Sequence, residues 1–184
     1  MKKILTFGLS MVIVAAIAIT GTLAYLSDDT DSITNRFTFG NISMKLEETY
    51  AANSKIYPGA VIAKTPVITI NAKSETCYVY ALVDNGFASD MATLNISADW
   101  TAIGRTGTKT VYVYKTTVAN SENDQALTAI FTQVTFSGEN LTSANIETVA
   151  GSTITVDAFA YQSAERTQSD ANTAALAHFG VTAL

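Results

Sequence analysis

The chain has 184 residues, with 16 acidic and 11 basic side chains and a formal net charge of −5 at pH 7. This acidic balance argues against nucleic acid as a partner, because binding phosphates needs Lys and Arg, and against docking on an anionic membrane surface. Cys77 is the only cysteine, so it has no partner for an internal disulfide. We expect its side chain to be buried in a strand, since an intermolecular disulfide would need an exposed thiol.

Residues 1–24 have the pattern of an export signal. Two lysines are followed by an apolar run to Ile19, and small residues stand at Thr22 and Ala24, where a signal peptidase excludes bulky side chains. We expect cleavage after Ala24, so that the mature chain begins at Tyr25 with nine basic and 16 acidic side chains. The alternative is an uncleaved anchor, for which the apolar run is slightly shorter than the ~20 residues of a relaxed span.

The segment after the signal begins with a polar leader, residues 25–36, and then alternates as strands do. Residues 37–46 predict a strand whose phase slips at Gly40-Asn41, where a β-bulge would absorb one residue. Residues 47–55 read as a loop and Pro58-Gly59 as a turn. We expect the next strand to begin at Thr65-Pro66 and end at Ile70, because proline suits a strand start or an edge.

Residues 76–83 form the clearest predicted strand. Its two faces both carry apolar or aromatic side chains, so both are expected to be covered. One face holds Cys77, Val79, Ala81 and Val83, and the other holds Tyr78, Tyr80 and Leu82.

The second half predicts more strands and one helix. Apolar and polar side chains alternate over residues 94–100, which predicts a strand, and further strands are predicted at 110–114, 129–136 and 152–161. Residues 104–107 read as a hairpin loop and residues 121–125 as a polar loop. Ser169 is expected to cap a helix with Asp170 in its first turn and Gly180 at its end. After the signal helix, seven or eight strands and a short C-terminal helix predict an all-β, antiparallel jelly roll or β-sandwich in a single domain, residues 37–184.

Residues that would carry chemistry are scarce. His178 is the only histidine, so neither a zinc site nor a Ser-His-Asp triad is expected, and His178 itself is expected to be a packed or surface side chain. Asp29 and Asp31 have the spacing of a calcium loop but lack its glycine and its distant glutamate. We therefore expect no catalytic residue, no metal and no cofactor. The aromatic residues Tyr78, Tyr80, Tyr112 and Tyr114 would suit a sugar-binding face or, more simply, core and cross-strand packing.

Four stretches, taken in order, resemble the TasA/camelysin family of exported bacterial proteins, which a dedicated signal peptidase (SipW) processes. The first stretch is the signal junction at residues 21–28, and the second is Phe39-Gly40-Asn41-Ile42. The third consists of Tyr57-Pro58-Gly59, Lys64-Thr65-Pro66 and Cys77-Tyr78-Val79-Tyr80. The fourth is residues 158–165 with the helix that follows. The segment between Asn85 and Asn145 carries no matching motif.

The resemblance implies a secreted jelly-roll subunit of an extracellular fibre, in the biofilm matrix or on the cell surface, that assembles by donor-strand exchange. In that arrangement the N-terminal segment of one subunit completes a sheet of the next. The donor would be Tyr25 to about Asn35, with Tyr25, Leu26 and Ile33 as apolar anchors. Its partners would be copies of the same chain, a related matrix subunit and, during export, the signal peptidase, with membrane contact only before cleavage.

Other interpretations stay open at this point. The acidic segment 25–36 is alternatively a disordered leader, or it pairs with its own sheet. A monomeric adhesin or carbohydrate-binding module would need an exposed aromatic platform. The metalloprotease activity described for the camelysin branch is not expected here, because this chain has one histidine and no recognised zinc motif. If fibres form, cleavage after Ala24 would also be the step that releases the donor segment from the membrane.

Overall fold

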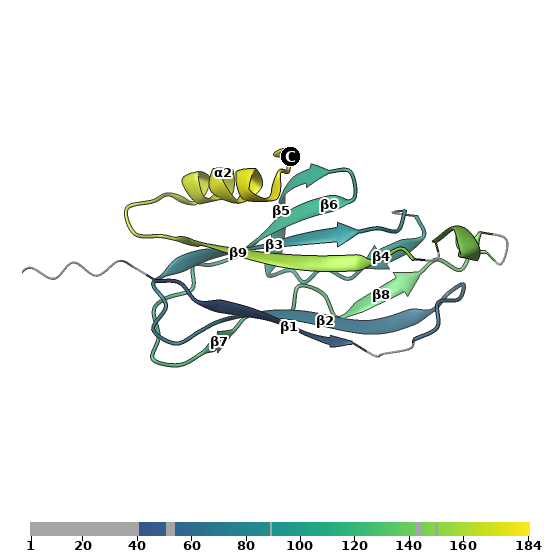
Figure 1. Ribbon diagram of the computed structural model, residues 1–184, viewed down its shortest axis with the longest axis horizontal. Coiled ribbons are helices and arrows are strands. Elements are labelled where there is room, and N and C mark those ends of the chain that lie inside the picture. Colours follow the sequence, from purple (N-terminus) through teal and green to yellow (C-terminus); the bar gives the residue numbers. More distant parts are fainter. Residues whose placement is uncertain (1–40, 51–53, 89, 143–144, 150) are drawn as a thin grey trace, which may run out of the picture. The chain divides into compact units, whose positions relative to one another are not determined.

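The computed structural model describes residues 41–50, 54–88, 90–142, 145–149 and 151–184. These residues form two antiparallel sheets packed as a β-sandwich, with one short C-terminal helix (Figure 1). The predicted antiparallel β-sandwich with its short C-terminal helix is thus confirmed, although nine strands are described where the sequence predicts seven or eight. The described elements are the strands β1 (Met44–Tyr50), β2 (Val61–Ile70), β3 (Cys77–Asn85), β4 (Ala92–Leu94), β5 (Trp100–Thr106), β6 (Lys109–Tyr114), β7 (Gln125–Ala126), β8 (Gln133–Phe136) and β9 (Ile154–Gln162), the 3₁₀ helix η1 (Ile146–Val149) and the helix α2 (Gln168–Phe179).

The two sheets share the strands almost equally. The first has the order β1-β2-β8-β4, with β7 pairing farther along β2, and the second has the order β5-β6-β3-β9. The main core lies between them, and its fully buried members include Ile68, Val79, Ile130 and Phe131. Among the described elements, β1 and β4 are therefore the ends of one sheet and β5 and β9 the ends of the other.

Strand β3 has the two covered faces that its sequence predicts. Cys77, Val79, Ala81 and Val83 lie in the main core. On the opposite face Tyr80 is fully buried in a second cluster, together with Ala171 and Ala175 of α2. A central strand flanked on both faces buries nearly every side chain, which explains its almost unbroken apolar sequence.

The N-cap of the helix lies two residues before the predicted one. Thr167 is the N-cap, and it forms a capping box with Asp170: the Thr167 hydroxyl accepts from the Asp170 N–H, and the Asp170 carboxylate accepts from the Thr167 N–H. Ser169 therefore lies inside the helix. Gly180 ends it in the left-handed region, with φ at 64°, as expected.

A glycine in β5 lets the helix and the C-terminal tail approach the sheet closely. Gly104 was predicted to lie in the hairpin loop, but the loop is Gly107-Thr108 and Gly104 stands at a bulge in β5. A Cβ atom at Gly104 would contact Leu176 of α2 and would lie 2.7 Å from the Thr182 carbonyl oxygen. The Thr182 oxygen also accepts from the Arg105 N–H at 2.8 Å, and the Leu184 N–H donates to the Ile103 oxygen at 3.1 Å, so the tail covers the outer edge of β5.

Strand β2 starts four residues earlier than predicted and contains Pro66 in its interior. The Pro66 carbonyl accepts from the Ile130 N–H at 3.1 Å, so the Pro66 backbone faces Ile130 and turns away from β1. Its missing N–H therefore interrupts no bond of the β1–β2 ladder. Proline is tolerated here because residues 127–132 leave the regular ladder between β7 and β8.

The predicted strand 94–100 is wrong, because the chain changes sheets within it. β4 ends at Leu94 and β5 begins at Trp100 in the other sheet. Asn95 stops the first strand, since its side-chain oxygen accepts from the backbone N–H groups of Thr132 and Gln133 at 3.1 and 2.9 Å. The alternation persists through the crossover because residues on both sides of it pack on the same core.

Three smaller boundaries also differ from the sequence prediction. Residues 47–50 continue β1 instead of forming a loop, Gln125 and Ala126 form the short strand β7 instead of closing a polar loop, and β8 begins at Gln133 rather than at residue 129. β1 is an edge strand with a charged sequence, and such a strand is held chiefly by backbone pairing that composition does not reveal.

Candidate functional site

The outer edge of β9 carries backbone groups that no described strand pairs with. The Gly86 N–H donates to the Thr153 oxygen and the Ser163 N–H donates to the Thr76 oxygen, both at 2.9 Å, so the odd-numbered residues of β9 turn their backbone groups toward β3. The register between β3 and β9 is unbroken from Cys77–Gln162 to Asn85–Ile154. The even-numbered residues of β9 therefore turn their N–H and C=O groups outward.

Strand β1 has a corresponding outer edge. The Asn71 N–H donates to the Ser43 oxygen at 2.9 Å, and the β1–β2 register is continuous, so the odd-numbered residues of β1 face β2. Met44, Leu46 and Glu48 turn their backbone groups away from it. The edges of β1 and β9 lie on the same side of the sandwich (Figure 1), and we call the strip between them the seam.

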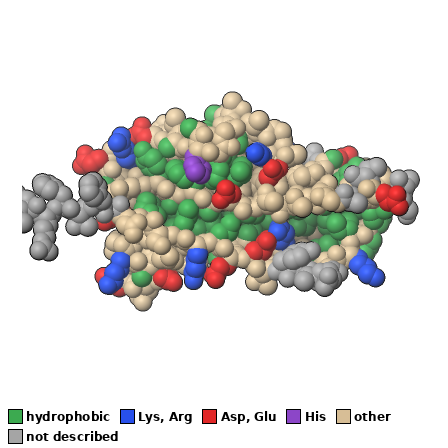
Figure 2. Space-filling view, in the orientation of Figure 1, with side chains coloured by type: hydrophobic (Ala, Val, Ile, Leu, Met, Phe, Trp, Pro, Cys, Tyr) green, Lys and Arg blue, Asp and Glu red, His purple; other side chains and the backbone are tan. Residues whose placement is uncertain are grey.

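Apolar side chains of intermediate burial line the seam. Figure 2 shows a band of hydrophobic side chains along the middle of this face, between the two sheets. Strands β1 and β9 both contribute to the packing around the main core, and Leu46 of β1 keeps 36% of its surface exposed. The contributors are Met44 on one side and Ile154, Val156, Ala158 and Ala160 on the other.

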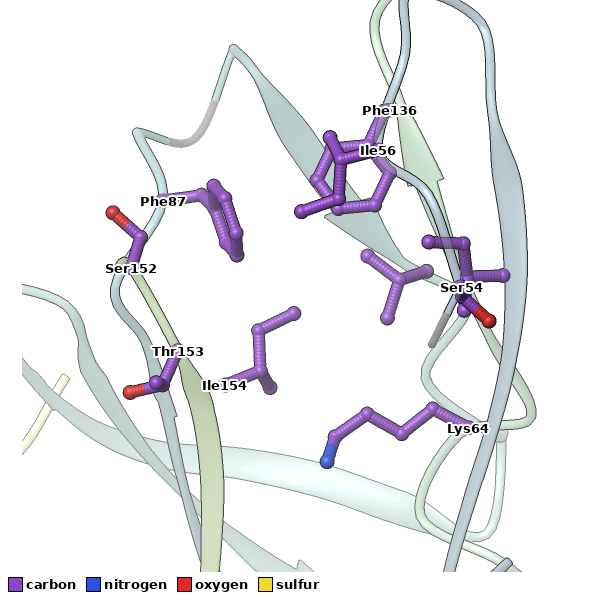
Figure 3. A pocket seen from close by; sticks show the side chains of 10 residues that line it. Ser54, Ile56, Lys64, Phe87, Phe136, Ser152, Thr153 and Ile154 are labelled. Atoms are coloured by element: carbon purple, nitrogen blue, oxygen red, sulfur yellow. The ribbon is translucent and has the colours of Figure 1, made fainter. Parts of the chain in front are cut away.

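A cavity of about 250 Å³ opens between the two sheets, bordered by the start of β9. Ser152, Thr153 and Ile154 form one wall with Phe87, and Ile56 and Phe136 lie opposite them (Figure 3). Lys64 borders the cavity, and its ammonium group is 2.5 Å from a carboxylate oxygen of Glu48 in β1. The cavity is therefore mainly apolar, with Ser54, Ser152 and Thr153 also in its lining and one charged pair at its margin.

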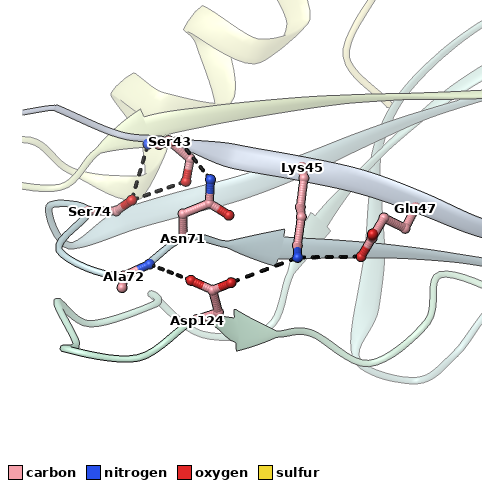
Figure 4. A network of polar contacts seen from close by, with 7 residues as sticks. All are labelled: Ser43, Lys45, Glu47, Asn71, Ala72, Ser74 and Asp124. Carbon is pink, nitrogen blue, oxygen red and sulfur yellow. Dashed lines mark hydrogen bonds and ion pairs between the residues drawn. The ribbon is translucent and has the colours of Figure 1, made fainter.

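A polar network fixes the other end of the seam, where β1 begins (Figure 4). The Ser43 N–H donates to the Ser74 hydroxyl at 3.1 Å, and that hydroxyl donates back to the Ser43 carbonyl at 3.0 Å. The Asn71 amide donates to the Ser43 hydroxyl at 2.8 Å. Asp124 extends the network by accepting from the Ala72 N–H and pairing with Lys45, which also pairs with Glu47. These bonds anchor β1 to the turn between β2 and β3.

The signal segment 1–24, the junction Ala24–Tyr25 and the donor anchors Leu26 and Ile33 lie outside the described residues, as do Asp29 and Asp31. In the part of the chain that is described, no helix is long and apolar enough to cross a membrane.

Cys77 and His178 have the surroundings expected of them. Cys77 is fully buried, and burial raises the pKa of its thiol to about 11, so the thiol is inaccessible for an intermolecular disulfide. His178 is exposed, and its ring stacks on Phe159 with centroids 4.5 Å apart. Within the described ranges no three His, Cys, Asp or Glu side chains gather as metal ligands would.

The four tyrosines do not form an exposed platform. Tyr80 is fully buried, and its hydroxyl donates to the Asn172 side chain at 2.9 Å. Tyr114 packs on Trp100 with ring centroids 5.0 Å apart, and Tyr78 and Tyr112 are half-buried. Tyr112 and Arg105 border a second cavity of about 370 Å³, between β4 and the β5–β6 hairpin.

Comparisons with protein-family models, with curated proteins and with solved structures found no match to this chain. The description of the seam therefore rests on strand register, backbone hydrogen bonds and side-chain burial. Sequence reasoning missed it because two strand edges from different sheets meet only in the folded molecule. One signal was available: the even-numbered residues 154–160 are all apolar but small or medium in size, which suits a face that a further strand completes.

Proposed function

We propose that this protein is a secreted structural subunit of an extracellular fibre, in a biofilm matrix or on a cell surface. It assembles by donor-strand exchange, in which an N-terminal segment of one subunit pairs with a strand edge of the next. In this proposal the sandwich is a jelly roll, the signal is cleaved after Ala24, and the protein has no enzymatic activity.

The observation that carries the proposal is the seam. A monomer that exposes two strand edges beside apolar side chains exposes a site for pairing with another chain, and soluble proteins usually protect such edges. A donated strand would satisfy the outward backbone groups of Met44, Leu46, Val156 or Ala158 with main-chain hydrogen bonds. Its apolar side chains would pack against the band of Figure 2 and fill the cavity beside Ile154.

The donor in this proposal is Tyr25 to about Asn35. Tyr25, Leu26 and Ile33 supply apolar side chains, while three aspartates make the segment soluble before it pairs. The described members of both cores lie after Asn41.

The test compares the mature chain, residues 25–184, with a chain that lacks Tyr25–Arg36. Negative-stain electron microscopy and light scattering should find fibres for the first and monomers for the second, with the same circular dichroism spectrum for both. Addition of a synthetic peptide of residues 25–36 should cap growth, and a scrambled peptide of the same composition is the control. Monomers for both chains under all conditions would sink the proposal.

A further inference from the structure

The two edges of the seam are not equivalent. β1 carries Lys45, Glu47 and Glu48 among seven residues, and charged side chains are a common protection of edge strands against pairing. β9 carries a single charge, Asp157, among nine residues. β9 also begins at the apolar cavity, through Ile154. The less protected edge is therefore that of β9.

The carboxylate of Asp157, the single charged residue of β9, bonds at the middle of the outer edge, although the Asp157 backbone faces β3. The outward N–H of Ala158 donates to a carboxylate oxygen of Asp157 at 2.8 Å. This bond satisfies the Ala158 N–H, which would otherwise donate to an incoming strand at the centre of the edge. A strand can pair along the whole of β9 only after the Asp157 side chain turns away.

We propose that the β9 edge is the acceptor for the N-terminal segment of a second copy, and that Asp157 restrains its addition. The inference rests on the proposed function and specifies the site and its regulation. The segment lies antiparallel to β9, which spans outward backbone positions from Ile154 to Gln162. Its apolar side chains face Val156, Ala158 and the cavity.

The direction of the chain favours a second copy over the same one. β1 begins near Ser74, next to the end of β9, so β1 and β9 run in opposite directions. A segment that folds back from Asn41 to pair antiparallel with β1 in the same molecule would therefore run parallel to β9. A segment from another molecule is free to run antiparallel, which is the somewhat more stable pairing. If the segment paired with β9 of its own molecule, the extent of pairing would not depend on protein concentration.

Proline substitutions distinguish the two edges. Ala158→Pro removes an outward N–H of β9 and leaves the β3–β9 ladder intact, so it should abolish fibre growth while the thermal unfolding transition remains cooperative. Leu46→Pro makes the equivalent change on β1 and should leave growth within about twofold of the wild type. Loss of growth in Leu46→Pro alone would overturn the assignment to β9.

Changes at Asp157 test the restraint without affecting the core. Asp157→Ala should raise the elongation rate about three- to tenfold, the factor that corresponds to one hydrogen bond of typical net strength. Asp157→Asn keeps a side-chain oxygen that can accept from the Ala158 N–H, so its elongation rate should lie between those of the wild type and Asp157→Ala. An unchanged rate in Asp157→Ala would refute the restraint.

Amide hydrogen exchange provides a measurement that does not depend on any variant. On assembly the amides of Val156, Ala158 and Ala160 should gain protection, whereas protection at Leu46 alone would contradict the inference. If the mature chain forms no fibres, the proposed function fails. Exchange with the peptide of residues 25–36 then tests the acceptor separately, and absence of protection on β9 at saturating peptide would overturn it.

Discussion

At the scale of single residues, Asp99 connects three parts of the chain at the crossover between the sheets. Its carboxylate pairs with the Lys115 ammonium at 2.5 Å and accepts from the Thr128 hydroxyl at 2.5 Å, and its carbonyl accepts from the Lys115 N–H at 2.9 Å. The bond from Lys115, followed by that from Thr128, lowers the pKa of Asp99 below its usual value. The carboxylate is therefore bound more favourably in the folded state than the protonated acid.

This shift predicts a pH dependence of stability. Because the folded-state pKa is lowered, the contribution of Asp99 is complete above the pKa of an unfolded aspartate, about 3.9, and disappears as the pH falls through the folded-state value. Asp99→Asn should lower Tm at pH 7, and the difference from the wild type should shrink toward zero as the pH falls from about 5 to about 2. Thermal unfolding across this range measures it. A difference that stays constant with pH would contradict the assignment, and Glu122→Gln, in an exposed loop, is the control.

At the scale of elements, the alternation of apolar and polar side chains predicted a strand correctly only where the whole alternating segment lies in one sheet. β3 was predicted well because Cys77 to Val83 alternate between two covered faces. The segment 94–100 was mispredicted because alternation continues through the crossover that begins at Asn95. The length of β1 was missed since Glu47 and Glu48 are charged, although the strand pairs with β2 along its whole length.

The same limit applies to the candidate site. The small apolar residues of β9 were visible in the sequence, but their position opposite β1 depends on packing between residues more than 100 positions apart. Pro66 illustrates a related point: whether an interior proline is tolerated depends on which neighbour its backbone faces, and that neighbour, Ile130, is distant in sequence.

The docking of α2 on the second sheet depends on Gly104. Gly104→Ala would place a methyl group against Leu176 and the Thr182 carbonyl, and we expect it to lower the free energy of unfolding by about 1–3 kcal/mol. Urea denaturation measures the loss. Gly138→Ala is the matched control, because a Cβ there would come no closer than 3.8 Å to Gly59 and should be nearly neutral. Equal effects of the two substitutions would show that the close approach has no energetic role.

At the scale of the whole molecule, Cys77 reports on unfolding. It is fully buried in β3, in the core between the sheets, so a thiol reagent reaches it only when that core opens. At pH 8 the native protein should react at least about a thousandfold more slowly than the chain in concentrated urea. Rapid labelling of the native protein, or a disulfide-linked dimer on a non-reducing gel, would contradict the buried position.

The C-terminal tail has a consequence for the form of an assembly. Because Thr182 and Leu184 bond to the outer edge of β5, the second sheet keeps only its β9 end open among the described strands. On the proposed mechanism β9 is then the single acceptor edge of the second sheet, and it matches the single donor of each subunit. Growth would be linear and polar, with two chemically different fibre ends, and lateral branching through the second sheet would be prevented.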